Sequence, residues 1–486
     1  MHPFARTLSL LALCWLAPAT RAQEAKPAAK PQPANPTPVT ELNVSPAAAP
    51  LPIFRYRLHP VAGKLMPGNA ASVYLRIRHD ITPQGWEQLK KKPLAWLDLP
   101  LGKLPVQEAR TFVDSWAKKL KQIEIGTRRE SCDWGYTLAE QRTDVINILL
   151  PDVQEMRNWA RLIALKARVE MAEGDLDEAV HTLGTGIAFG RHVGDGPFLI
   201  NNLAGMAICG AMLSRLEEVI AQPDAPNLYW ALTAIPRPLV STRRAMEIEQ
   251  RLAENMIPEM NEVFSTHSPA EWTVLAEKIY AGMLRLARIS AEGDQVSHLP
   301  ARKLLPDDYA SYKQQYLDTL RVTLRKTLPK SKGTVSAMSD DEVMARGIVN
   351  QYRLMRDAAF KIAYLPHADA IKRTAESEKA TTQAKEGPAA VFSAMQASIT
   401  GPIYAEIRLE RRIAMLRTIE AIRLYIAAHD GKLPDSLEAI TEVPIPLDPA
   451  TGAPFPFSRE GDVAVLTTPK AGLPSPAPIF RITVRK

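Results

Sequence analysis

Helix-start signals recur along most of this chain, and they constrain its fold more than any other feature. Asp175, Ser268 and Ser339 each precede an apolar-periodic stretch and are followed three residues later by glutamate, the arrangement of a capping box. Pro269 adds a residue that is favoured at the first position of a helix. From Val106 onward the helical pattern continues for about three hundred residues. The sequence therefore predicts a mainly α fold.

The same signals predict where individual helices begin and end. A helix opening at Pro151 should stop at Gly174, and one that follows Ser339 should reach about residue 364. The last long helix should span residues 402–429, since an apolar stripe runs along it and Gly431 closes it. The stripe consists of Met415, Ile419, Ile422 and Ile426.

Residues 1–22 have the layout of a secretory signal peptide. Arg6 supplies the positive start, residues 8–17 form an apolar run too short to span a bilayer, and small residues precede a processing site after Ala22. Cys14 does not indicate a lipoprotein, because Leu13 stands where lipid attachment requires a small residue. We therefore expect an exported protein, periplasmic or extracellular, with no membrane span after removal of the signal.

The next two regions differ sharply in composition. Residues 23–52 are rich in proline and alanine and are predicted to form a disordered linker. Residues 53–128 are predicted to form a small mixed α/β region. In it, residues 53–58 and 72–78 alternate like strands, although the second run equally suits a helix that starts after Asn69.

Residues 129–430 are predicted to form the helical domain. The helices around Gly174 resemble a tetratricopeptide-type hairpin at Ala167, Gly174-Asp175, Ala179 and Leu183. Further copies at that period are not evident. Helical hairpins arranged in a compact bundle or in a short superhelix are therefore both open.

Residues 431–486 change character again. His429-Asp430-Gly431, Leu433-Pro434, Asp448-Pro449 and Thr451-Gly452 resemble the C-terminal part of type II secretion pseudopilins, in which a helix leads into a small sheet. The resemblance implies a fold, with strands expected at 463–466 and 479–484. It implies neither polymerisation nor calcium binding, because the membrane helix and the late acidic loop of that family are absent.

Bulk charge and cysteine content exclude some classes of function. The net charge of +7 is a small excess of basic residues over 53 acidic ones, and such an excess does not indicate nucleic-acid binding. Short basic runs such as Lys90-Lys91-Lys92 suit solvated faces. Cys132 and Cys209 permit one disulfide in an oxidising compartment, but two cysteines cannot define a disulfide scaffold.

Several short motifs match catalytic patterns only partly. Ser115 and Lys118 have the spacing of penicillin-recognising enzymes, but the later elements of that signature are missing, so a helix surface is favoured. Gly184, Gly186 and Gly190 do not fit a dinucleotide loop and suit either close helix packing or an interruption of the helix. His181 and His192 would share a helix face about 16 Å apart, too far to hold one metal. His367 and Asp369 form a pair without further ligands in sequence.

Two clusters stand out from this background. Asp133 beside Trp134 suits either an acid catalyst or a helix N-cap. Tyr229 and Trp230 beside Asn227 suit either stacking on a sugar or anchoring a helix in the core, and anchoring is favoured.

With three further stretches, these clusters resemble a recurrent family of exported planctomycete proteins over residues 54–250. The three stretches are Tyr56-Arg57-Leu58-x-Pro60, Pro67-Gly68-Asn69-Ala70-Ala71 and Pro236-Arg237-Pro238-Leu239, with Glu247-x-Glu249 after the last of them. The resemblance predicts a shared domain and no particular activity.

The sequence thus favours a non-catalytic exported scaffold or binding protein of the cell envelope. Its partner would be a protein or a glycan, and no nucleic acid is expected. We predict no catalytic, cofactor-binding or metal-binding residues and no cofactor. The alternative is a carbohydrate-active enzyme on an α/α fold, which would need two carboxylates brought together by the fold.

Overall fold

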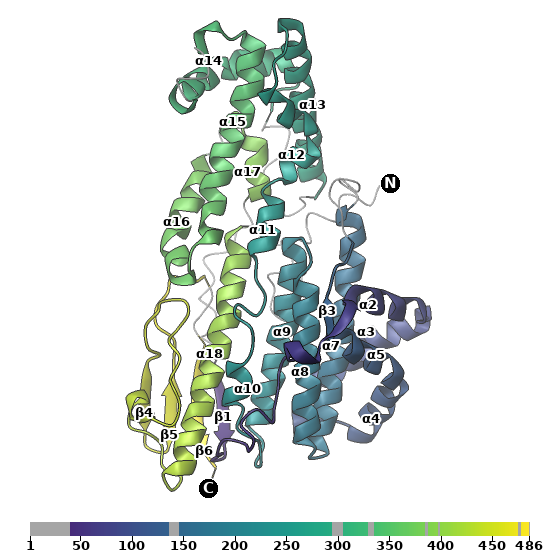
Figure 1. Cartoon of the computed structure of the whole chain (residues 1–486), viewed down its shortest axis with the longest axis vertical. Coiled ribbons are helices and arrows are strands. Elements are labelled where there is room, and N and C mark those ends of the chain that lie inside the picture. Colours follow the sequence, from purple (N-terminus) through teal and green to yellow (C-terminus); the bar gives the residue numbers. More distant parts are fainter. Residues whose placement is uncertain are drawn as a thin grey trace, which may run out of the picture. The chain divides into compact units, whose positions relative to one another are not determined.

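The computed structural model describes residues 39–135, 145–293, 305–328, 335–383, 387–396, 399–474 and 478–485. Within these residues the protein is mainly α, as predicted, with two small sheets (Figure 1). The predicted signal peptide and the first part of the predicted linker lie outside the described residues. No helix in the described part of the chain is long and apolar enough to cross a membrane.

The chain divides into two compact units whose boundaries differ from the predicted domains. One, the middle unit, is built around residues 243–402. The other, the terminal unit, combines residues 39–135, 152–242 and 403–485. The predicted helical domain, residues 129–430, is therefore shared between the two, because residues 243–402 form the middle unit, whereas most of the last helix belongs with residues 152–242.

The terminal unit contains the pair of helices that the sequence predicts around Gly174. Gly174 has a φ of +85°, which favours glycine, and the Asp175 carboxylate accepts a bond from the Glu178 amide at 3.0 Å, as predicted. Helix α7 begins earlier than predicted and runs through Pro151. The helices of this unit are α2 (Ala70–His79), α3 (Pro83–Leu97), α4 (Val106–Ser115), α5 (Ala117–Thr127), α7 (Val145–Ala172), α8 (Leu176–Gly194), α9 (Leu199–Ile220), α10 (Tyr229–Thr233) and α18 (Thr400–Ala428), of which α7 and α18 begin in the middle unit.

Helices α8 and α9 pack unusually closely because glycines line their contact. A Cβ atom on Gly205 of α9 would lie 2.5 Å from the Gly190 carbonyl oxygen of α8, and one on Gly190 would lie 2.7 Å from Cys209 Sγ. Gly186 would likewise collide with Met212. Of the two alternatives that the sequence left open for the α8 glycines, close packing holds, because α8 is not interrupted at them.

A four-stranded sheet has the order β1-β6-β5-β4. Strands β5 (Val463–Leu466) and β6 (Ile479–Val484) have the predicted bounds, and β4 (Phe457–Glu460) pairs antiparallel with β5. The fourth strand, β1 (Val39–Val44), pairs parallel with β6 and buries Leu42 and Val44. The predicted disorder of residues 23–52 is therefore wrong from residue 39 onward, because a sheet edge far along the chain provides the missing hydrogen-bond partners.

The predicted strand at residues 53–58 is also wrong, since this segment lies along a helix and has no neighbouring strand. For residues 72–78 the helical alternative holds, because Asn69 caps α2 by accepting a bond from the Ala71 amide at 3.0 Å. A short parallel pair, β2 (Met66–Asn69) with β3 (Arg129–Ser131), completes this region.

The described residues of the middle unit form helices joined by loops, with no strand among them. Ser268 and Glu271 form the predicted capping box, and Ser339 accepts a bond from the Glu342 amide at 3.2 Å. Its helices are α11 (Arg243–Glu249), α12 (Leu252–Met256), α13 (Pro269–Gly293), α14 (Tyr309–Thr327), α15 (Asp340–Phe360), α16 (His367–Gln383) and α17 (Ala390–Gln396). Helix α15 ends earlier than predicted and continues as a 3-10 turn over residues 361–364.

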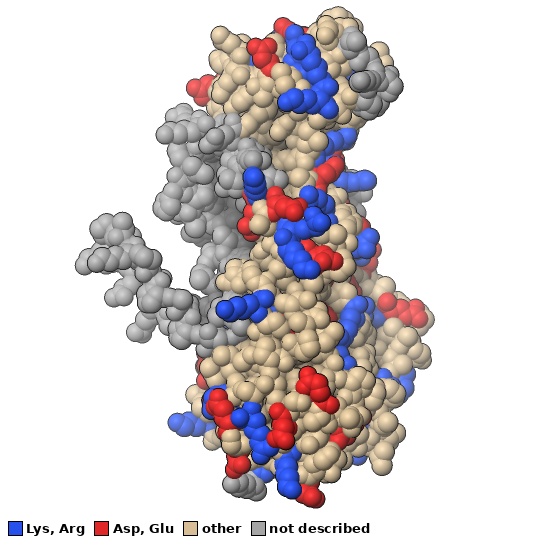
Figure 2. All heavy atoms as spheres, turned by 90° about the vertical axis from the view of Figure 1, so that its left-hand side faces the viewer, with Lys and Arg blue, Asp and Glu red and all other residues tan. Residues whose placement is uncertain are grey.

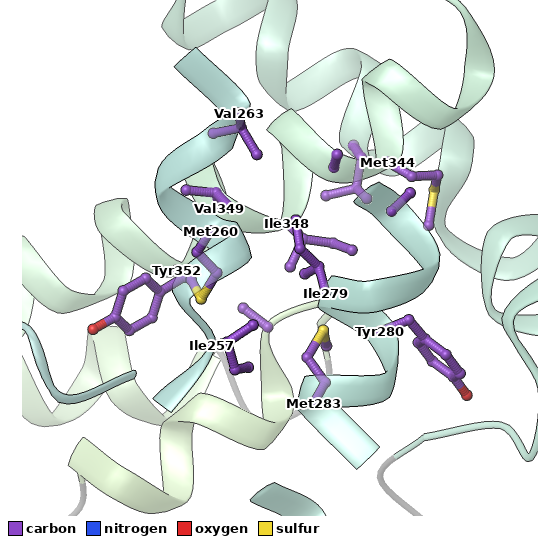
Figure 3. Close-up of a cluster of buried hydrophobic side chains, with 14 of the residues drawn as sticks. Ile257, Met260, Val263, Ile279, Tyr280, Met283, Met344, Ile348, Val349 and Tyr352 are labelled. Carbon is purple, nitrogen blue, oxygen red and sulfur yellow. The ribbon is translucent and has the colours of Figure 1, made fainter. Parts of the chain in front are cut away.

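One apolar cluster forms the core of this unit, and Figure 3 shows Ile279 and Met283 of α13 close to Ile348 of α15. At its margin the Asp341 carboxylate receives bonds from three side chains. Thr273, Tyr309 and Lys313 each lie 2.7 Å from it. One carboxylate thereby joins α13, α14 and α15.

Candidate functional site

One face of α8 carries the candidate functional site of the terminal unit. Asp177, Gly184 and Arg191 follow one another on that face at intervals of about two helical turns. The segment 55–59 contacts them in order. The side chains of Arg55 and Tyr56 each donate to the Asp177 carboxylate at 2.6 Å. A Cβ atom on Gly184 would lie 2.8 Å from the Arg57 carbonyl oxygen, so the glycine leaves room for the main chain of the segment. Its last residue, His59, bonds to Arg191.

The bonds of His59 determine its protonation. Arg191 lies 2.8 Å from His59 Nε2, and because a guanidinium only donates, Nε2 accepts. His59 Nδ1 lies 2.9 Å from the Pro60 carbonyl oxygen, which only accepts, so Nδ1 carries the hydrogen. His59 is therefore held as a neutral imidazole.

His192 is the second imidazole of the site and is buried. The Tyr74 hydroxyl lies 2.8 Å from its Nδ1, and Trp134 Nε1 donates to its carbonyl oxygen at 3.1 Å. The Tyr74 ring stacks on Trp134 with centroids 5.9 Å apart and meets Phe189 edge to face. We call the residues His59, Tyr74, Trp134, Arg191 and His192 the histidine cluster.

Burial and charge both keep the two imidazoles neutral. The pKa of His59 and that of His192 are each lowered from 6.5 to about 4, first by burial and then by the positive charge of Arg191. Burial also raises the pKa of Tyr74 well above its usual value. With Tyr74 and His192 almost fully enclosed, the cluster suits holding the fold and responding to acid better than proton transfer to a substrate.

Two stretches of the family resemblance pair next to this cluster. Asn69 Oδ1 accepts from the Asp133 amide at 2.9 Å, and its Nδ2 donates to the Asp133 carbonyl oxygen at 2.6 Å. The Asp133 carboxylate is exposed and accepts from the Gly135 amide at 3.0 Å, where Gly135 has a φ of +68°. It stabilises a turn, and it lacks the apolar enclosure that an acid catalyst there would need.

The two thiols of the terminal unit are free. Cys132 and Cys209 form no disulfide, so the pairing that the sequence permitted is not made. Burial raises the pKa of both thiols, and Cys209 donates to the Ile187 carbonyl oxygen at 3.6 Å. Protonated, enclosed thiols are poor nucleophiles.

The partial catalytic motifs of the sequence do not assemble into sites. Ser115 is the last residue of α4 and donates to the Phe112 carbonyl oxygen at 2.6 Å, whereas Lys118 belongs to α5. The structure places His181, exposed and 3.5 Å from Glu124, apart from the buried His192.

His367 begins α16, and Asp369 lies 3.3 Å from Lys372. Among the residues that the structure describes, no three His, Cys, Asp or Glu side chains gather as a metal site would require.

The aromatic cluster at residues 227–230 anchors a helix, as favoured. Asn227 Oδ1 accepts from the Tyr229 amide at 3.1 Å at the start of α10. The Tyr229 ring is buried, and its hydroxyl donates to the Pro444 carbonyl oxygen. Trp230 is partly exposed and meets Phe54 edge to face.

Helix α18 carries a second set of buried polar side chains. Arg423 and Glu420 form a fully buried ion pair, and Arg423 also donates to the carbonyl oxygens of Ser45 and Ala225. Two carboxylates one turn apart, Glu406 and Glu410, accept from the amides of residues 242 and 239 at 2.7 and 2.8 Å. These groups bind main-chain atoms of neighbouring loops.

Surface charge adds no comparable feature on the face shown in Figure 2. Lysine and arginine side chains are interspersed there with aspartate and glutamate, and no single sign covers that face.

Sequence reasoning did not find the histidine cluster. His59 occupies the unspecified position of Tyr56-Arg57-Leu58-x-Pro60, and Tyr74 lay in a run whose secondary structure was open. The sequence placed His181 and His192 on one helix face, but this spacing was used only to exclude a shared metal. Comparisons of the chain with protein-family models, with curated proteins and with solved structures found no match. The family resemblance over residues 54–250 therefore stays a prediction.

Proposed function

We propose that this protein is an exported, non-catalytic helical scaffold or binding protein of the cell envelope. The observation that supports the proposal most directly is what the buried charges contact. Arg168 donates to the carbonyl oxygens of Trp96 and Leu99, and Arg423 to those of Ser45 and Ala225. Such groups hold loops and chain ends in place on a rigid helical frame, which is the requirement for presenting a binding surface.

A carbohydrate-active enzyme receives less support from the same residues. Glu406 and Glu410 each accept a main-chain bond from a neighbouring loop, which leaves them as structural acceptors. The aromatic rings that such an enzyme would use to hold sugars instead pack on one another: Trp159 meets Trp86 and Trp116 with centroids 5.8 and 5.7 Å apart.

Export is tested first, by fusing the full chain to a reporter enzyme that is active only outside the cytoplasm. We expect activity from the full chain and none from a matched variant that lacks residues 2–22. Equal activity of the two fusions would contradict export.

The non-catalytic role is tested with purified protein lacking residues 1–22 and isolated cell envelopes. We expect the protein to sediment with the envelopes and to release no soluble sugar fragments. Steady release of fragments would identify an enzyme, and failure to sediment would contradict a binding role. A Glu406→Gln, Glu410→Gln variant serves as control, since loss of any release in it would assign the carboxylates a catalytic role.

A further inference from the structure

A run of consecutive apolar residues is exposed on the terminal unit. Leu51, Ile53 and Phe54 are 84%, 43% and 50% exposed, and Pro52 between them is exposed as well. Exposed runs of this length are uncommon on folded proteins unless they serve an interaction. We call residues 51–54 the apolar loop.

The apolar loop is held in one conformation between two anchored ends. The Arg55 amide donates to the Pro52 carbonyl oxygen at 2.8 Å, closing a turn. Phe54 meets Trp230 edge to face with centroids 6.3 Å apart. Upstream, the Ala47 amide donates to the Arg423 carbonyl oxygen at 3.2 Å, and downstream lies the histidine cluster. Its exposure is therefore part of the folded structure.

The charged residues that flank the apolar loop in the sequence are all basic. Residues 42–79 contain no aspartate or glutamate but include Arg55, Arg57, Lys64, Arg76 and Arg78. The Arg57 guanidinium lies 4.2 Å from the centre of the Phe54 ring, so a positive charge borders the apolar surface directly. Asp177 offsets Arg55, at 2.6 Å, and Glu155 offsets Arg78, at 3.2 Å.

We propose that the apolar loop, bordered by Arg57, docks the protein on the surface of an anionic lipid membrane. Aliphatic and aromatic side chains at the headgroup level, with flanking basic residues, are the features of interfacial membrane binding. Sugars bind on the flat faces of aromatic rings, whereas Leu51 and Ile53 offer aliphatic surface. A two-fold contact between two copies would place the basic residues of one loop against those of the other.

The inference rests on the proposed binding role at the cell envelope and names its partner chemistry. The test uses purified protein lacking residues 1–22 and sedimentation with vesicles of phosphatidylcholine alone or mixed with phosphatidylglycerol. We expect binding to the anionic vesicles, weakened by salt, and little binding to the zwitterionic ones. Leu51→Ser should weaken binding about ten-fold, because it removes one apolar side chain from the lipid contact.

Leu447→Ser is the matched control, since Leu447 is 55% exposed elsewhere in the terminal unit and should leave binding unchanged. Absence of binding to anionic vesicles, or equal effects of the two variants, would overturn the proposal. So would a dimer in light scattering that Leu51→Ser dissociates, because the loop would then bind a second copy. The sugar-release assay contains no vesicles, so failure here leaves the non-catalytic role separately testable.

Discussion

Acid should destabilise the terminal unit through its two neutral histidines. Both imidazoles have a folded-state pKa of about 4 and an unfolded value of 6.5. Between these values the unfolded chain binds more protons than the folded one, so the free energy of unfolding falls as the pH is lowered through this window. The stability contributed by the neutral pair is present above about pH 6.5 and lost by about pH 4.

The magnitude follows from the two pKa values. Lowering one pKa from 6.5 to about 4 corresponds to about 3 kcal/mol when the whole window is crossed, of which about 2 kcal/mol appears between pH 7 and pH 5. For His59 and His192 together we expect a loss of about 4 kcal/mol over that interval. Protonating His59 would further disfavour protonating His192, because the charge on His59 lowers the pKa of His192.

The assay is urea unfolding followed by tryptophan fluorescence at several pH values. Among the described tryptophans only Trp272 belongs to the middle unit, so the signal reports chiefly on the terminal unit. The comparison is with a His59→Gln, His192→Asn variant, whose amides replace the bonded ring nitrogens without titrating. The variant should lose about 4 kcal/mol less than the wild type between about pH 7 and pH 5.

His181→Gln is the matched control, because His181 lies on the same helix but is exposed. It should keep the pH dependence of the wild type. If the double variant and the wild type lose stability in parallel, the two histidines are not the groups that titrate on unfolding, and the reasoning fails.

Three further substitutions test the packing and the buried charges by urea unfolding. Gly205→Ala should lower the free energy of unfolding by more than about 3 kcal/mol, because its Cβ would meet the α8 main chain. Gly210→Ala is the control: it has open space on the same helix and should be neutral or stabilise by up to about 1 kcal/mol. Equal effects of the two variants would contradict the close packing. Arg423→Met should lower the free energy of unfolding by about 3–5 kcal/mol, because it removes the ion-pair partner of the buried Glu420. The double change Arg423→Met, Glu420→Gln should recover part of that loss. No recovery would show that the bonds from Arg423 to main-chain carbonyl oxygens matter more than the ion pair. Ser339→Ala should destabilise the middle unit by about 1 kcal/mol, because it removes the cap of α15. Ser339→Asp should retain the cap and the stability. Loss of stability in both variants would argue against capping.

Local signals in the sequence predicted the mainly α class, several of the helices and two of the strands. Capping residues such as Asp175 and Ser339 act within one turn of chain, so their effect is visible without tertiary context. The apolar alternation at residues 463–466 and 479–484 likewise predicted β5 and β6 with their observed bounds. For the glycines of α8 the sequence left close packing and a helix break both open, and the continuous helix decides for packing.

Tertiary structure alone decided what these elements contact. Strand β1 forms only because β6, more than four hundred residues later, offers it a free edge, and no local pattern in residues 39–44 encodes that partner. Segment 53–58 alternates like a strand, yet it lies on α8, where Gly184 leaves room for its main chain. The histidine cluster brings together residues from three distant segments, and its neutrality comes from burial and from Arg191. Burial is a property of the folded chain, so it was invisible in the sequence.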